Sequence, residues 1–157
     1  MELQHSESFY IRTLLNKVKI KEVMATKLIT LFVDDPFSLV EEKLRRFHIR
    51  HLPVVDKAGK LVGIVTQRDL YRVQSPRKDE EGNWYYDKES LDSFILKHVM
   101  TKDPVILFPE SSIAEALLLM VEKKYGCIPI VDRNHLLCGI ITQVDILRIA
   151  AQILKEK

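Results

Sequence analysis

Two Thr-x-x-Asp motifs, each at the end of an apolar run, are the residues of this chain best suited to binding a polar ligand. Thr66 and Asp69 follow the run LVGIV, and Thr142 and Asp145 follow LLCGII. If a helix begins after each Thr, the Thr hydroxyl and the free N–H groups of the first turn can bind an anion such as phosphate. An Asp one turn further can accept both hydroxyls of a ribose. Helix capping alone also explains the motif, with Thr as the cap and Asp accepting from the backbone.

Both motifs belong to a repeat of constant spacing. GIVTQRDL at 63–70 and GIITQVDI at 139–146 are separated by 139 − 63 = 76 positions, and no gap is needed between 21–72 and 97–148. A fixed period predicts two copies of one structural unit. A single copy is too short to bury a large core, so we expect the two copies to pack face to face as one pseudo-symmetric module.

The elements that must position the motifs are expected in the order strand, helix, strand, strand, helix. In the first copy the strands are 29–33, 50–56 and 61–66, and a helix begins near Gln67. The intervening helix SLVEEKLRRF should be started by an Asp N-cap and a Pro at its first position. Its apolar face is predicted to contain Leu39, Val40, Leu44 and Phe47.

The second copy repeats this order. VILF at 105–108 is predicted as the strand, and Ser112 with Glu115 has the spacing of a capping box before the next helix. The first 19 residues are expected to form a helix that caps the module or meets a second chain. The predicted domains are a helical lead-in at 1–19, a first repeat at 20–73, a linker at 74–95 and a second repeat with a C-terminal helix at 96–157.

Composition excludes several classes of protein. The 157 residues are 46% hydrophobic and 29% charged, which is typical of a soluble globular domain, and the net charge of +2 gives no basic face for nucleic acid. Cys127 and Cys138 have no metal-binding spacing and are expected to be buried free thiols. The N-terminus lacks the apolar core of a signal peptide, and no apolar run could span a bilayer. We therefore expect a cytoplasmic protein without a membrane partner.

An enzyme is not expected. His48, His51 and Cys127 lie near the motifs, but Cys127 replaces His51 in the second copy, and no Ser or Cys has a triad-like set of partners. We expect no catalytic residues, no catalytic cofactor and no metal site.

The repeated motifs resemble the tandem CBS-domain pair, also called a Bateman module. The resemblance rests on HIRHLPVVDKAGKLVGIVTQRDL at 48–70, GCIPIVDRNHLLCGIITQVDI at 126–146 and a Val-Met pair near the start of each copy. It covers most of the chain and leaves no second domain. It implies an α/β (α+β) fold of two pseudo-symmetric β-α-β-β-α repeats in a stand-alone protein.

The resemblance also implies a site for an adenosine ligand in each cleft between the two repeats. Thr66, Asp69, Thr142 and Asp145 would be the phosphate and ribose contacts. The base pockets would be near 26–29 and 50–53, and near 102–105 and 126–129. The further predicted site residues are Thr26, Lys27, Ile29, Arg50, His51, Leu52, Pro53, Arg68, Lys102, Val105, Cys127, Ile128 and Pro129.

The function that follows is a regulatory module that senses an adenosine nucleotide (AMP, ADP, ATP) or an S-adenosylmethionine-like ligand, without catalysis. The alternative is a structural or dimerisation module whose ligand sites are empty or vestigial. The expected partners are an adenine nucleotide, a second copy of the chain and a regulated protein that the sequence does not name. The final helix favours a homodimer, because Ile146, Ile149, Ile153 and Leu154 are predicted to be exposed on it.

The two sites differ in charge. Arg68 stands two residues after Thr66, and Val144 takes that place in the second copy. A cation is disfavoured in the first turn of a helix unless an anion binds there. We therefore expect the first site to prefer ligands with more phosphate, and the second to tolerate AMP or an uncharged adenosine group.

Overall fold

The computed structural model describes residues 5–74, 76–85, 91–92 and 94–155, without the side chains of residues 5, 6, 77, 84 and 85. These residues form two compact units. The first-repeat unit is Ile29–Pro104, and the second-repeat unit is Met1–Leu28 together with Val105–Lys157. Each unit contains one Thr-x-x-Asp motif. The mixed α/β class and the two repeats predicted from the sequence are confirmed.

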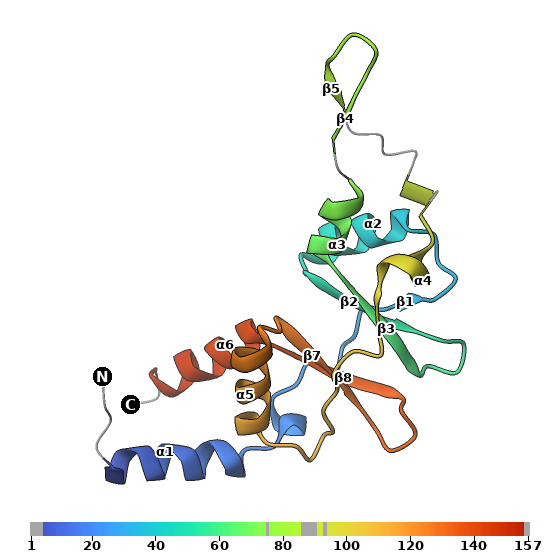
Figure 1. Ribbon diagram of the computed structural model, residues 1–157. Coiled ribbons are helices and arrows are strands. Elements are labelled where there is room, and N and C mark those ends of the chain that lie inside the picture. Colours follow the sequence, from blue (N-terminus) through green and yellow to red (C-terminus); the bar gives the residue numbers. More distant parts are fainter. Residues whose placement is uncertain (1–4, 75, 86–90, 93, 156–157) are drawn as a thin grey trace. The chain divides into compact units, whose positions relative to one another are not determined.

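In the first-repeat unit, the antiparallel strands β2 and β3 are the centre of a four-stranded sheet (Figure 1). Strand β1 runs parallel to β2, and β6 runs antiparallel to β3 on the other side. Helix α2 packs on β2 and α3 packs on β3. The bounds are β1 Leu31–Phe32, α2 Ser38–Phe47, β2 His51–Val55, β3 Leu61–Thr66, α3 Gln67–Val73, α4 Leu96–Val99 and β6 Thr101–Lys102.

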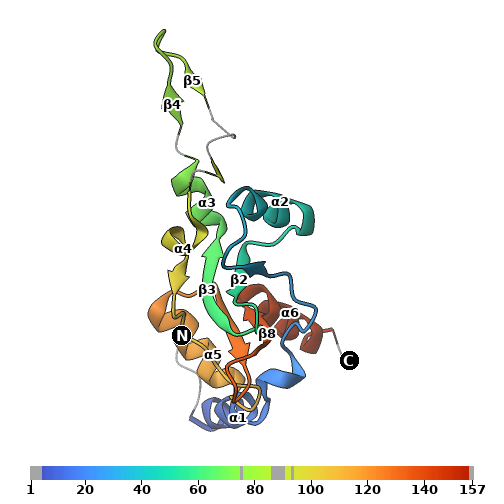
Figure 2. The same cartoon turned by 90° about the vertical axis from the view of Figure 1, so that its right-hand side faces the viewer.

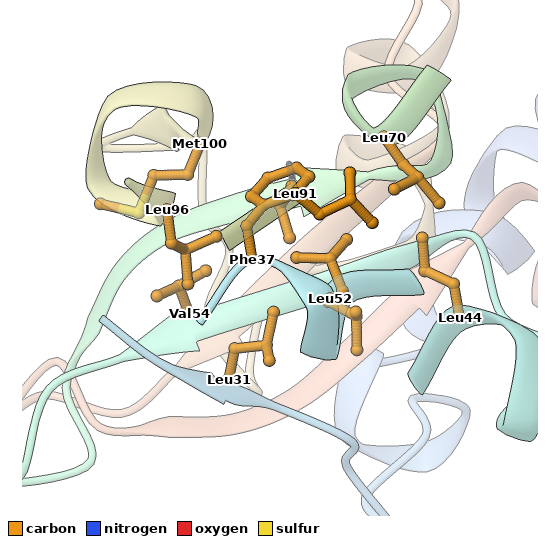
Figure 3. Packing of buried hydrophobic residues seen from close by; sticks show 11 residues of the cluster. Leu31, Phe37, Leu44, Leu52, Val54, Leu70, Leu91, Leu96 and Met100 are labelled. Atoms are coloured by element: carbon orange, nitrogen blue, oxygen red, sulfur yellow. The ribbon is translucent and has the colours of Figure 1, made fainter. Parts of the chain in front are cut away.

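Apolar side chains from every layer of this unit meet in one core (Figure 3). Phe37, Leu52 and Val54 are fully buried, and the rings of Phe37 and Phe94 lie with their centroids 6.3 Å apart. The alternation of buried positions in β2 and β3 is nearly absent, because both faces of these strands are covered. The core therefore fixes the ends of β2 and β3, where the first motif lies.

The second-repeat unit has the same central hairpin, made of β7 and β8 with the same register as β2 and β3. Helices α5 and α6 contact β7 and β8, and α1 packs on α5. Fully buried Ile20, Ile128, Ile130 and Ile141 form its core with side chains from α5. The bounds are α1 His5–Lys17, the 3-10 turn Ile20–Glu22, α5 Ile113–Lys123, β7 Cys127–Val131, β8 Leu137–Thr142 and α6 Gln143–Ile153.

Each unit contains the lead-in segment of the other sequence repeat. In the second-repeat unit, Ala25 exchanges two backbone hydrogen bonds with Ile140 of β8, at 2.9 and 3.0 Å. In the first-repeat unit, β6 pairs with β3 through Thr101 and Ile64. The segments 20–28 and 96–104 are therefore exchanged between the two repeats, which sequence order does not reveal.

The linker between the repeats contains a hairpin that the sequence analysis did not predict (Figure 2). Strand β4 Arg77–Lys78 pairs antiparallel with β5 Trp84–Tyr85. The Asp79 carboxylate accepts from the backbone N–H groups of Glu81 and Asn83, at 3.0 and 2.8 Å, and holds the turn. These bonds lower the pKa of Asp79, with the Asn83 bond as the largest cause.

The start of α2 differs from the prediction. The helix begins at Ser38, and Phe37, at the N-cap position, has helical angles and no side-chain capping bond. The Asp35 carboxylate instead accepts from the N–H of Phe32 at 2.9 Å, which closes a turn before the helix. The predicted Asp cap is therefore wrong, because the carboxylate is engaged upstream. Phe47 at the helix end is 41% exposed, so the predicted buried face ends at Leu44.

The first strand of each repeat is shorter than predicted. β1 has two residues, and the carbonyl of Thr30 accepts from Lys43 Nζ at 2.7 Å. The segment 105–108 forms a single bridge, between Leu107 and Ile130. Pro104 and Pro109 flank it, and a proline has no N–H for a ladder. These segments are positioned by the neighbouring strand rather than by their own propensity.

Helix α6 also corrects one expectation. Ile146 and Ile149 pack against the core of the second-repeat unit, whereas Ile153 and Leu154 are 58% and 86% exposed. The apolar stripe predicted as one exposed face is thus divided along the helix, because the core lies beneath Ile146 and Ile149 and does not cover Ile153 and Leu154. The predicted N-terminal helix is confirmed as α1, which covers α5.

Candidate functional site

The first candidate site is the junction of β3 and α3. The N–H and the hydroxyl of Thr66 both donate to Oδ2 of Asp69, at 2.9 and 2.7 Å. The N–H of Asp69 donates back to Thr66 Oγ1 at 3.4 Å. Thr66 has extended angles and the following residues are helical, which is the geometry of a capping box. The predicted cap is confirmed.

The second candidate site has the same arrangement at the junction of β8 and α6. The N–H and the hydroxyl of Thr142 donate to Asp145 Oδ2 at 2.9 and 2.6 Å, and the N–H of Asp145 donates to Thr142 Oγ1 at 3.2 Å. The two boxes agree within 0.2 Å at every bond, although they lie in different units. The equivalence of the repeats therefore extends to side-chain geometry.

A third capping box, at the start of α5, has no predicted role in ligand binding. Ser112 Oγ accepts from the N–H of Glu115 at 3.2 Å, and Glu115 accepts from the N–H of Ser112 at 3.0 Å. It begins α5, in a position that carries no predicted ligand contact. A capping box alone is therefore not evidence of a ligand site, but among the described residues the two Thr-x-x-Asp boxes have a feature that the Ser112–Glu115 box lacks.

In both Thr-x-x-Asp boxes, an arginine lies next to Oδ1, the carboxylate oxygen that does not serve the cap. Arg72 NH1 lies 3.4 Å from Asp69 Oδ1, and Arg148 NH1 lies 3.0 Å from Asp145 Oδ1. The carboxylates are largely buried, whereas the two arginine side chains are 74% and 63% exposed. Neither arginine was among the site residues predicted from the sequence. The signal was present, because both occur at the same offset of 148 − 72 = 76 positions.

The residue opposite each Thr differs between the sites. His51 of β2 pairs with Thr66, and Cys127 of β7 pairs with Thr142. Burial, with a smaller contribution from the charge of Arg50, lowers the pKa of His51. Burial raises the pKa of Cys127 to about 12. Both groups are thus held in their neutral forms at neutral pH.

The predicted anion site at the helix start is partly occupied by the protein itself. The N–H of Gln67 donates to the carbonyl of Arg50 at 2.9 Å, and the N–H of Gln143 donates to the carbonyl of Gly126 at 3.1 Å. Together with the Asp69 and Asp145 N–H groups, these bonds satisfy donors that a phosphate would need. The Thr hydroxyls likewise direct their hydrogens at the carboxylates.

The remaining predicted site residues on β2, β7 and α3 include both buried and exposed side chains. Leu52, Pro53, Ile128 and Pro129 are buried within β2 and β7, and Leu52 and Ile128 are members of the two apolar cores. Arg50 and Arg68 are exposed at the ends of β2 and in the first turn of α3.

The predicted pocket segments are divided between the units. Thr26 and Lys27 belong to the second-repeat unit and Ile29 to the first-repeat unit. Lys102 pairs with Gly63 in the first-repeat unit, and Val105 belongs to the second-repeat unit. The motif residues Thr66 and Asp69 share a unit with Arg50, His51 and Arg68, as Thr142 and Asp145 do with Cys127.

Two other kinds of site find no support in the part of the chain that the structure describes. No group of three or more His, Cys, Asp or Glu side chains there could hold a metal ion. Among the same residues, no helix combines the length and the apolar character needed to cross a membrane. Cys127 and Cys138 are both free, and Cys127 is buried as expected, whereas Cys138 is only partly buried.

Comparison with known proteins identifies the family. The family model of the CBS domain matches residues 20–75 and 96–152. The chain is 31% identical over 140 residues to a CBS domain-containing protein from Dictyostelium discoideum, covering 88% of this chain and 95% of that protein. This chain belongs to the CBS-domain family, as a tandem pair of CBS domains.

Two solved structures have the same fold. The Vibrio cholerae protein named for acetoin utilization (AcuB) superposes with a TM-score of 0.73 at 30% identity, covering 88% of this chain and 93% of that chain. CBSX2, solved in complex with AMP, superposes with a TM-score of 0.72 at 25% identity, covering 88% and 99%. The overall fold of this chain is thus shared with both proteins.

Proposed function

We propose that this chain is a regulatory module that binds an adenosine nucleotide at its two Thr-x-x-Asp sites and performs no catalysis. The observation that carries the proposal is the pair of Asp carboxylates whose Oδ1 atoms face an exposed arginine at both sites. A carboxylate oxygen in this position can accept from ribose hydroxyls, because Oδ2 alone serves the cap. The AMP complex of CBSX2 supports the choice of an adenosine ligand.

We propose that the protein is not a catalyst because the thiol of Cys127, the candidate nucleophile, stays protonated. Cys127 has a pKa of about 12 because it is buried, so almost none of it is thiolate at neutral pH. His51, the candidate base, lies in the other unit. The protein would act by changing the behaviour of a partner, and a cytoplasmic location stays a prediction.

Ligand-detected native mass spectrometry of freshly purified protein tests this proposal. We expect a bound mass matching AMP, ADP, ATP or S-adenosylmethionine. Thermal shift with the same panel should then show stabilisation, since a ligand at 100 times its Kd stabilises by about 2.7 kcal/mol. GMP is the matched control for the base. If no adenosine compound shifts the transition, the structural alternative is favoured, and conversion of ATP to a new product would contradict the non-catalytic role.

We also propose a homodimer formed through the second-repeat unit. On α5, Leu118 and Val121 are 59% and 74% exposed, and on α6, Val144 and Leu147 are 54% and 68% exposed. Subtracting 76, the first repeat has Glu42, Arg45, Arg68 and Tyr71 at these four positions. The fold therefore does not require apolar residues there.

A second copy is the occupant we propose for these residues, because exposed apolar side chains on one unit can pack against the same side chains of another copy across a two-fold axis. Light scattering should give twice 18.3 kDa at micromolar concentration. Leu118→Glu with Val121→Arg, which copies the first repeat, should give the monomer mass. Tyr71→Arg at the matching first-repeat position is the control and should leave the dimer intact. A parent protein with the mass of one chain would contradict the proposal.

A further inference from the structure

Several of the donors that could bind a phosphate at a helix start, including the Thr hydroxyl and the N–H of the first helical residue, are engaged at both sites. The Thr66 hydroxyl lies 2.7 Å from Asp69 Oδ2 and the Thr142 hydroxyl 2.6 Å from Asp145 Oδ2. A hydroxyl has one hydrogen, so a Thr that donates to Asp cannot also donate to a ligand. The N–H of Gln67 is bonded to the carbonyl of Arg50. The capping box therefore offers a phosphate few donors, and a cationic side chain from outside the box would strengthen its binding.

Arg72 and Arg148 are the cationic side chains already at the carboxylate. Each approaches the Oδ1 atom that a ribose would use, at 3.4 and 3.0 Å. Both side chains are mostly exposed, and an ion pair of this kind contributes little free energy. The guanidinium can therefore leave Oδ1 when a ribose binds. The ribose hydroxyls then donate to Oδ1 in place of the arginine N–H.

We propose that Arg72 and Arg148 are the phosphate-binding residues of the two sites, each moving from its Asp to the ligand's phosphate as the ribose binds. The inference rests on the proposed function and adds a preference for nucleotides over nucleosides. A nucleoside displaces the arginine from the carboxylate and offers it no anion. A nucleotide offers a phosphate, whose oxygens match the planar fork of the guanidinium.

The positions in the two repeats support this assignment over Arg68. Arg68 is replaced by Val144 in the second repeat, so it could serve one site alone. Arg72 and Arg148 occupy equivalent positions on α3 and α6 and contact equivalent atoms. They therefore supply a phosphate contact that both sites have in common.

The test is calorimetry with AMP and adenosine on Arg148→Gln, in a chain whose other site is weakened by Asp69→Asn. The parent for comparison carries Asp69→Asn alone. We expect AMP to bind about twofold to fivefold more weakly, the range for an exposed ion pair. Adenosine should bind equally well or more tightly, because it no longer competes with the guanidinium. Arg72→Gln with Asp145→Asn is the reciprocal experiment.

Arg133→Gln is the matched control, since it removes an exposed positive charge from the turn between β7 and β8. It should leave both affinities unchanged, and Arg148→Lys should retain part of the AMP preference. Equal weakening of AMP and adenosine by Arg148→Gln would show that the arginine only holds the Asp, and would overturn the inference. An unchanged ratio would also overturn it. If the parent binds neither ligand, the proposed function fails as well, which the other outcomes do not imply.

Discussion

The sulfur of Met100 lies 2.5 Å from the point where a β-carbon on Gly63 would stand. Met24 makes the equivalent contact with Gly139 in the other unit. The shared Gly of the repeated motif is thus explained by the exchanged lead-in segments. Each segment places a methionine against the strand that leads into the Thr-x-x-Asp site, and only glycine leaves room for it.

We expect Gly63→Ala to destabilise the protein by about 1–3 kcal/mol, the usual range for overpacking. Met100 is 7% exposed, so its side chain has little room to move away. Met100→Ala should itself be destabilising, but it should make Gly63→Ala nearly harmless. Urea unfolding of the two single variants and the double variant measures the coupling. Additive losses, within about 0.5 kcal/mol, would show that the two residues do not compete for space.

Asp69→Ala and Asp145→Ala should weaken adenosine-ligand binding more than they weaken folding. Loss of the cap costs about 1 kcal/mol of stability. Loss of a charged acceptor for ribose should cost about 1.5–3 kcal/mol of binding, or roughly tenfold to a hundredfold in Kd. Calorimetry and thermal unfolding of the same samples separate the two effects.

Glu115→Ala is the control for this pair, since it breaks a capping box of similar geometry that has no predicted ligand role. It should lower stability by a similar amount and leave affinity unchanged. If Asp69→Ala and Asp145→Ala bind as tightly as the parent, the ribose role is wrong and the boxes only cap.

Arg68→Val should reduce the preference for ATP over AMP at the first site. Arg68 is exposed in the first turn of α3, so its contribution to phosphate binding should be about fivefold at most. Calorimetry with ATP and AMP, with Asp145→Ala to silence the second site, measures the ratio. Val144→Arg in the second repeat is the complementary variant and should raise the ratio there. Should Arg68→Val leave the ratio unchanged, the predicted asymmetry of the sites is not due to this residue.

Stability should fall as the pH drops below about 6.5, the ordinary pKa of histidine. The pKa of His51 is lowered in the folded protein by burial and by Arg50, so the unfolded chain binds a proton that the folded chain resists. The contribution of neutral His51 to the free energy of unfolding is present above the pKa that histidine has in the unfolded chain, and it is lost in more acidic solution. The urea midpoint at pH 7.5 and pH 5.5 should differ less in His51→Gln than in the parent. His98→Gln, which alters an exposed histidine of α4, should retain the parent's difference; equal behaviour of the two variants would rule out His51 as the cause.

The sequence by itself determined the features that depend on neighbouring residues. The 76-residue repeat predicted two equivalent units, and the Thr-x-x-Asp and Ser-x-x-Glu spacings predicted the three capping boxes, because a cap joins residues three positions apart. The hairpins β2–β3 and β7–β8 were predictable for the same reason, since each turn lies between adjacent apolar runs.

Only the tertiary structure decided the features that join distant residues. Met24 and Gly139 are 139 − 24 = 115 positions apart, and no local pattern indicates that the lead-in segment of one repeat packs on the strands of the other. The partial burial of Ile146 and Ile149 depends on where the core lies beneath α6. The sequence also left open the contacts of Arg72 and Arg148 with Oδ1 of Asp69 and Asp145. An arginine three residues after an aspartate in a helix can face either solvent or the carboxylate. Long-range packing selects among such local alternatives, since the free energy of burial belongs to the assembled unit rather than to any one segment.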